Sequence, residues 1–155
     1  MSAWRHARAI VLLPGMVTIA VPALLLSGEG AELASWPWVV AGAALILAGV
    51  AMWLWTVRLL ARIGKGTLAP WDPTRHLVVE GPYRHVRNPM ISAVAAVLLG
   101  EALLFASAGL LIWFALVVAI NTAYFVLSEE PGLESRFGDE YREYKRSVPR
   151  WVPRR

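Results

Sequence analysis

Three long stretches of this chain carry almost no charge. Residues 9–28 and 33–57 contain no Asp, Glu, Lys or Arg, and residues 88–128 contain only Glu101. A helix needs about 20 apolar residues to cross the hydrocarbon core of a bilayer, so the third stretch can hold two spans joined by a turn at residues 107–109. We therefore expect four transmembrane helices, at about residues 9–26, 38–60, 90–106 and 109–127.

The composition agrees with a membrane protein. Hydrophobic residues make up 57% of the chain and charged residues 17%, whereas soluble domains are about half apolar and a quarter charged. With 155 residues and no cysteine, we expect one all-α integral membrane domain over residues 1–155, without disulfides, cysteine nucleophiles or a metal site. The first span carries Pro14, Gly15 and Pro22, which membrane helices tolerate; a cleaved signal peptide is the alternative interpretation.

The charges predict which side of the membrane each connection faces. All 15 Lys and Arg residues lie before the first span, within residues 58–87 or within residues 136–155. The other two connections hold only acidic residues, namely Glu29 and Glu32, with Glu101 near the edge. By the positive-inside rule, both termini, the loop 61–89 and the tail 128–155 face the cytoplasm. Topology thus explains the net charge of +4, and we predict no nucleic-acid partner.

The cytoplasmic loop ends in residues 81–90, which read GPYRHVRNPM. Pro89 suits the first turn of the third helix, where its missing N–H costs nothing. The free amides of that turn favour an anionic group, and Arg87 can add a bidentate clamp. The alternative is that Arg84 and Arg87 only mark the headgroup boundary. The GxG at residues 64–66 is a weak nucleotide signal, because no strand–turn–helix context surrounds it.

The tail begins with two adjacent acids, Glu129 and Glu130. Either they start a new helix near Pro131, or they bind a cationic or hydroxyl-rich ligand, because acids are unfavourable at a helix C-terminus. Leu133, Phe137, Tyr141 and Tyr144 then form one apolar stripe at helical spacing, which predicts a C-terminal amphipathic helix on the inner leaflet or against the bundle.

Helices three and four form an antiparallel hairpin, so the segment around Arg87 and Asn88 and the pair Glu129 and Glu130 should meet at the cytoplasmic boundary. We expect a composite polar site there, at the edge of the lipid. Glu101, an ionisable group within a span, is a separate functional candidate; it can equally sit protonated or near the outer interface.

Three motifs carry a family resemblance: GxGTxxP at residues 64–70, LVxxGPYRxxRNPM at 77–90 and EExxLxxxFGxxYxxYxxxVPR at 129–150. Over roughly residues 60–155 this pattern resembles the isoprenylcysteine carboxyl methyltransferase and phospholipid N-methyltransferase superfamily, and most of all its small bacterial members. The resemblance implies a protein of the bacterial inner membrane that binds S-adenosylmethionine in a cytoplasm-facing pocket. It departs from the family at Ile91, where members usually have tyrosine, and at Asn88, where many have histidine.

The resemblance also implies roles for individual residues. Gly81 and Tyr83 would shape the cofactor loop, and the cofactor-binding residues would be Arg87, Asn88, Pro89, Glu129 and Glu130. For catalysis, we expect Arg150 to orient an anionic acceptor and Glu130 or Tyr141 to take a proton.

The acceptor would be lipidic or lipophilic: a phospholipid amine, a prenylated carboxylate or a small thiol. A reductase that uses NADPH and a non-catalytic membrane scaffold are the competing functions. The residues select neither the acceptor nor an oligomeric state.

Overall fold

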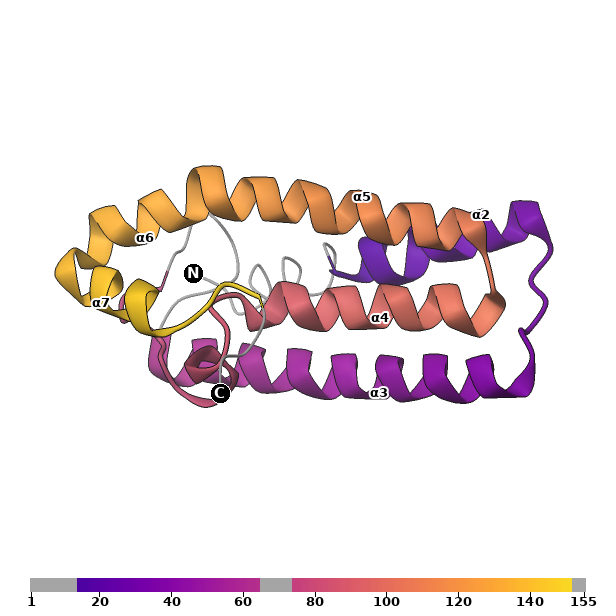
Figure 1. The fold of residues 1–155 in the computed structure, drawn as a ribbon, viewed down its shortest axis with the longest axis horizontal. Helices are drawn as coiled ribbons and strands as arrows, with labels where there is room; N and C mark the ends of the chain where they lie inside the picture. Colours follow the sequence, from indigo (N-terminus) through magenta and orange to yellow (C-terminus); the bar gives the residue numbers. More distant parts are fainter. Residues whose placement is uncertain (1–13, 65–73, 152–155) are drawn as a thin grey trace, which may run out of the picture.

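The computed structural model describes residues 14–64 and 74–151. This part of the chain is all-helical and forms five continuous helices (Figure 1). Their bounds are Met16–Glu29, Trp36–Gly64, Pro89–Phe105, Ala108–Phe137 and Asp139–Ser147. The helices Trp36–Gly64 and Ala108–Phe137 are long and apolar enough to cross a membrane, while Met16–Glu29 and Pro89–Phe105 are shorter apolar helices. The predicted helical fold is confirmed.

Each continuous helix divides into the segments used below. The first joins the π-helix η1 (Met16–Ala20) to α2 (Val21–Glu29). The second joins α3 (Trp36–Leu59) to the π-helix η2 (Leu60–Gly64). The third is α4 (Pro89–Phe105), preceded by the 3₁₀ turn η3 (Gly81–Arg84). The fourth joins α5 (Ala108–Tyr124), the π-helix η4 (Phe125–Glu129) and α6 (Glu130–Phe137), and the fifth is α7 (Asp139–Ser147).

The predicted end of the fourth helix at residue 127 was wrong. The helix continues through η4 into α6, and Pro131 lies in the first turn of α6. A proline inside an α-helix lacks one amide and clashes with the carbonyl four residues earlier. Here the Glu130 N–H bonds to the Phe125 carbonyl, five residues back. This local π-helical register lets the chain pass Pro131 without ending the helix.

The first helix uses the same arrangement, because η1 directly precedes the turn that contains Pro22. The predicted start of this helix at residue 9 lies outside the described residues, as does the GxG at Lys65 and Gly66. Its observed C-terminus is Glu29, three residues beyond the predicted 26.

Small residues bring α3 and α4 into close contact. Gly42, Gly49 and Thr56 are the buried residues of α3 and recur every seven positions. A Cβ on Gly42 would lie 2.5 Å from the Gly100 carbonyl oxygen, and one on Gly49 would lie 2.7 Å from the Ala93 carbonyl oxygen. Backbones this close are typical of membrane helix interfaces, where small residues maximise van der Waals contact.

A tight turn reverses the chain between α4 and α5, as the sequence predicted. Ala106 adopts a left-handed conformation with φ of 46° and ends α4. The Ser107 hydroxyl caps α5 by accepting from the Leu110 N–H at 3.1 Å. The same hydroxyl donates to Glu29 Oε2 at 2.5 Å, which fixes the end of α2 to the hairpin.

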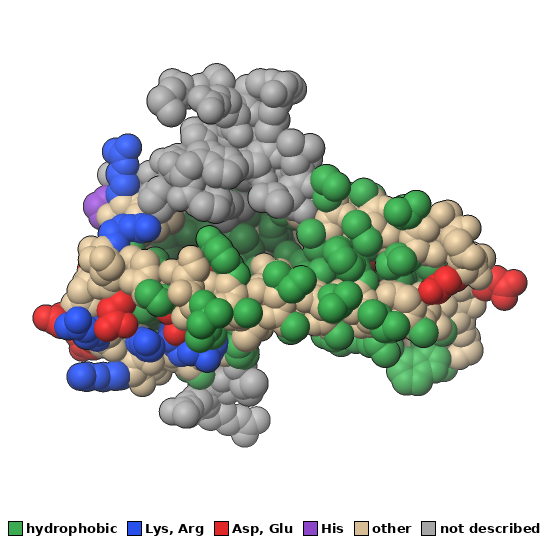
Figure 2. All heavy atoms as spheres, turned by 90° about the horizontal axis from the view of Figure 1, so that it is seen from above, with side chains coloured by type: hydrophobic (Ala, Val, Ile, Leu, Met, Phe, Trp, Pro, Cys, Tyr) green, Lys and Arg blue, Asp and Glu red, His purple; other side chains and the backbone are tan. Residues whose placement is uncertain are grey.

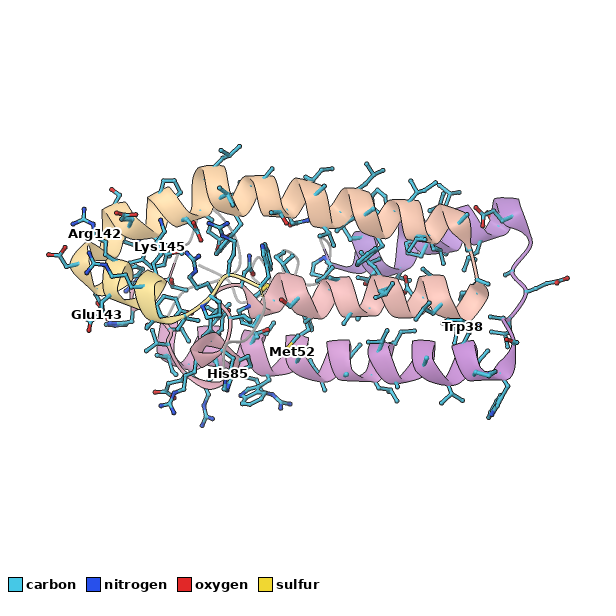
Figure 3. The ribbon with its side chains drawn as sticks, viewed as in Figure 1. Trp38, Met52, His85, Arg142, Glu143 and Lys145 are labelled. Carbon is cyan, nitrogen blue, oxygen red and sulfur yellow. The ribbon has the colours of Figure 1, made fainter. Side chains whose placement is uncertain are left out.

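Charged side chains gather at the ends of the molecule. Figure 2 shows basic and acidic groups together at the end formed by α6 and α7, apolar side chains along the middle, and acidic groups at the opposite end. In Figure 3, Arg142, Glu143 and Lys145 lie at the first of these ends, and Trp38 lies near the other.

The predicted amphipathic tail helix is divided in two. Gly138 has φ of 55° and separates α6 from α7. Tyr141 and Tyr144 are buried with Val148 in a cluster against which Leu77, Leu133 and Phe137 pack. The predicted apolar stripe is therefore real, but it lines the inside of a bend and caps the helical bundle.

Candidate functional site

A cavity of about 660 Å³ lies where the helix ends converge. Its walls come from η1, α3, α4, the continuous helix α5–η4–α6, and α7, together with residues 74–83. The wall-forming residues used below are Trp53, Tyr83, Arg87, Asn88, Ile91, Asn121, Phe125, Glu129, Arg136, Tyr141 and Tyr144. The volume falls within the range of about 300–1,000 Å³ that is common for small-molecule sites.

The first turn of α4 forms one wall. Pro89 occupies its N-terminal position, as predicted, and Asn88 caps it by accepting from the Ile91 N–H at 3.3 Å. Gly81 has φ of 56°, and a Cβ there would lie 2.9 Å from Leu59. Only glycine combines this backbone conformation with such close packing, so Gly81 sets the path of the loop that presents Tyr83.

Glu130 is the centre of a buried ion network. Its carboxylate accepts from Arg87 Nη1, and it accepts from Arg150 Nε at 3.1 Å and Nη2 at 3.0 Å. The side chains of Glu130 and Arg87 are only 4% and 8% exposed, and that of Arg150 is 34% exposed. The network therefore joins the start of α4, the start of α6 and the tail. A further bond from the Arg87 N–H to the Pro149 carbonyl, at 3.0 Å, strengthens this junction.

Glu129 occupies a different position from its neighbour. It lines the cavity and is exposed there, and no ion pair links it to another of the described residues. The two acids that adjoin in sequence thus point to different surroundings, with Glu130 held in the ion network and Glu129 available to a ligand.

Three tyrosines close the cavity on the tail side. The Tyr144 hydroxyl donates to the Tyr83 carbonyl at 2.7 Å. Tyr141 is 1% exposed, and its hydroxyl has no hydrogen-bond partner among the described residues, nor does Arg87 Nε. Burial raises the pKa of all three phenols, and the Glu129 charge adds to this effect at Tyr83. These tyrosines therefore stay neutral at physiological pH and keep their hydroxyl protons, which Tyr144 donates to the Tyr83 carbonyl.

The structure brings most of the predicted site residues together. Tyr83, Arg87, Asn88, Glu129 and Tyr141 line the cavity. The remaining four predicted residues support these walls from outside the cavity lining: Gly81, Pro89, Glu130 and Arg150. Ile91, at the position where the resembling family usually has tyrosine, also faces the cavity.

Several cavity residues were missed from the sequence. Asn121 is an amide within an apolar span, which was an available signal; its Nδ2 donates to the Val117 carbonyl at 2.8 Å. Arg136 lies seven residues after Glu129, but the predicted helix break at Pro131 concealed their common face. Glu101 is part of α4 and is not among the cavity-lining residues; its Oε2 has no partner among the described residues.

Comparison with known proteins identifies the family. A profile of the phospholipid methyltransferases matches residues 37–140, which include both helices of the hairpin and the acids that follow it. The chain belongs to the phospholipid methyltransferase family. An uncharacterized protein of Haemophilus influenzae is 43% identical over 44 residues, covering 27% of this chain and 70% of that protein. No solved structure matches the chain.

Family membership implies a membrane-bound methyltransferase that uses S-adenosylmethionine and a lipid acceptor. The residues of the cavity fit such a cofactor. Glu129 is free to accept hydrogen bonds, and three buried donors of the cavity wall lack partners among the described residues: Trp53 Nε1, Arg87 Nε and the Tyr141 hydroxyl. Trp53 and Phe125 supply apolar walls of the kind that an adenine ring requires.

Proposed function

We propose that this chain transfers the methyl group of S-adenosylmethionine to a lipid or lipophilic acceptor at the cytoplasmic face of a membrane. The observation that supports this most is the convergence of the hairpin ends and the tail on one cavity of about 660 Å³. The family supplies the reaction class, and the cavity supplies residues that suit the donor.

We also propose that all four apolar helices cross the bilayer within a single domain, 1–155, of an inner membrane. Glu29 and the Ser107 hydroxyl mark the outer end. The ion network of Arg87, Glu130 and Arg150 lies at the inner end. Both termini are then cytoplasmic, together with residues 61–89 and 128–155.

The bound cofactor supplies an electrophilic methyl group on a sulfonium, with a neutral thioether as leaving group. The cavity residues would hold it: Glu129 would accept from a hydroxyl or ammonium and Arg87 Nε would donate to an oxygen, with Asn88 and Tyr83 in the same cavity wall. Alignment of the reacting atoms accounts for much of the rate in such a displacement, so rigid walls matter more than acid–base groups.

The roles proposed for the tail residues follow from their contacts. Tyr141 is buried and neutral, and its hydroxyl, which has no partner among the described residues, would donate a hydrogen bond to a ligand at the cavity wall. Glu130 holds Arg87 in place, and Arg150 neutralises Glu130 from the tail side. Because Arg150 is 34% exposed, it also keeps donors available for an anionic acceptor.

The apolar part of the cavity suits the chain of the acceptor. Val94 and Val117 line the cavity from α4 and α5, within the apolar helices, whereas Glu129 lies towards the charged end. An acceptor with its chain along the valines would therefore present its head group near the methyl donor. A phospholipid amine, a prenylated carboxylate and a lipophilic thiol all have this form, and the family favours the phospholipid.

The test is calorimetric titration of detergent-purified protein with S-adenosylhomocysteine, the stable product of the donor. We expect saturable binding by the wild type. The affinity of Glu129→Gln should be lower by about ten-fold or more, since a charge-assisted hydrogen bond contributes about 1.5–3 kcal/mol. The matched control is Glu143→Gln on α7, an exposed acid away from the cavity.

Binding that is equal in both variants would remove Glu129 from the cofactor site. No binding by folded wild-type protein, measured also in lipid nanodiscs, would contradict the methyltransferase proposal. A parallel titration with NADPH then tests the reductase.

A further inference from the structure

Two arginines line the cavity, and their surroundings differ. Arg87 is buried, and its charge is balanced by Glu130. Arg136 is exposed at the cavity wall, and no carboxylate pairs with it among the described residues. Within the part of the chain that the structure describes, a ligand anion therefore meets one guanidinium that a carboxylate neutralises and one that no carboxylate pairs with.

Two contacts orient Arg136, and neither of them involves a carboxylate. Its Nη1 donates to the Thr74 carbonyl at 3.3 Å, and its guanidinium carbon lies 5.7 Å from the centre of the Phe137 ring. A guanidinium has five donors, so these contacts leave most of its hydrogen-bonding capacity free. Orienting the group in advance lowers the entropic cost of binding an oxyanion.

Arg136 and Glu129 share one face of the continuous helix. Both line the cavity, as do Gly132 and Leu133 between them. Seven residues of helix separate them by about 10 Å along the axis. The cavity walls and the adjacent Glu130 charge raise the pKa of Glu129, and the Arg136 charge opposes this rise, although no ion pair joins the two among the described residues. Among the described residues, the cavity thus presents a carboxyl group and a guanidinium that have no ion-pair partner at its charged end, which suits a dipolar ligand.

We propose that Arg136 binds the anionic group of the ligand in this cavity. This inference rests on the proposed function. The group is a carboxylate or phosphate, which a guanidinium binds through paired hydrogen bonds. It can belong to the aminocarboxylate of the cofactor or to the phosphate of the acceptor, and the experiment separates these two sources.

The cofactor arm compares two nucleosides that differ at one end. S-Adenosylhomocysteine carries the aminocarboxylate, and 5′-methylthioadenosine lacks it. Calorimetry in detergent is done on the wild type, Arg136→Gln and Arg136→Lys, with Arg146→Gln on α7 as an exposed control outside the cavity. We expect Arg136→Gln to lower the affinity for S-adenosylhomocysteine about ten-fold and to leave the affinity for 5′-methylthioadenosine unchanged. The affinity of Arg136→Lys for S-adenosylhomocysteine should lie between those of the wild type and Arg136→Gln.

The acceptor arm measures the binding of dioleoylphosphatidylethanolamine and of oleylamine, which lacks the phosphate. Selective weakening of the phospholipid in Arg136→Gln would assign the anion to the acceptor. An equal loss of affinity for both nucleosides would show a structural role and overturn the proposal. Unchanged binding in both arms would also overturn it.

An unchanged melting temperature of Arg136→Gln verifies its folding. If the melting temperature falls together with the binding affinity, the residue has a structural role, and this result also overturns the proposal. If the wild type binds neither nucleoside, the proposed function fails, and the lipid arm alone then decides the role of Arg136.

Discussion

Replacing Glu130 by glutamine tests whether the ion network holds the cavity together. The substitution keeps the size of the side chain but removes the charge that faces Arg87 and Arg150. Because the Arg87 side chain is 8% exposed, its guanidinium would remain buried beside a neutral amide. Removing one partner of a buried pair costs about 3–5 kcal/mol. The lost contact with Arg150 adds little to this cost, since a third of the Arg150 side chain is exposed to solvent.

The matched control is Glu134→Gln, one turn further along α6. Glu134 pairs with Arg142 at 2.9 Å, but the two side chains are 34% and 55% exposed. Exposed pairs are screened by solvent and contribute little. Both variants lose one carboxylate of the same helix, so their difference compares the buried network around Glu130 with an exposed ion pair.

The measurement is the free energy of unfolding from denaturant titration in detergent micelles, followed by tryptophan fluorescence. We expect Glu130→Gln to be destabilised by about 3–5 kcal/mol and Glu134→Gln to match the wild type. A double variant with Arg87→Leu should cost less than the sum of the single changes, because the two residues interact directly. Equal stability of the two glutamine variants would refute this account of the network.

Three further predictions follow from the packing and the topology. Gly42→Ala should destabilise the helical bundle by about 1–3 kcal/mol through overpacking, as measured by thermal melting, whereas Gly28→Ala should not, because a Cβ there meets nothing within 4 Å. Since the chain has no cysteine, Glu32→Cys should react with an impermeant maleimide from outside the cell and Glu143→Cys only after permeabilisation; the reverse pattern would refute the proposed orientation. Tyr144→Phe, which loses the bond to the carbonyl of residue 83, should lower the free energy of unfolding by about 1 kcal/mol, and no change would show that this bond does not hold the tail.

Apolar stretches and turn residues in the sequence were enough to predict the main helices and the hairpin. The helix start at Pro89 and the turn before α5 were predicted within a residue or two. Such features depend only on the local sequence. A proline is favourable in the first turn of any helix, and the length of a charge-free stretch shows whether it can cross a bilayer.

The course of the chain past Pro131 was not predictable from local rules. Proline indicates a helix end, yet η4 carries the helix through to Phe137. That continuity places Glu129 and Arg136 on one face, a relation that the predicted break concealed. Whether a proline ends a helix or is accommodated depends on how the surrounding elements pack.

The sequence by itself determined that this is a helical chain with apolar spans, that its charges lie at the ends of those spans, and which residue types gather near the hairpin ends. Only the tertiary structure decided that Glu130 is neutralised by Arg87 and Arg150, while adjacent Glu129 faces the cavity. Neighbours in a helix point in directions about 100° apart, so the partners of each depend on what packs against each side. Those partners come from α4 and the tail, which are distant in sequence and meet only in the folded protein.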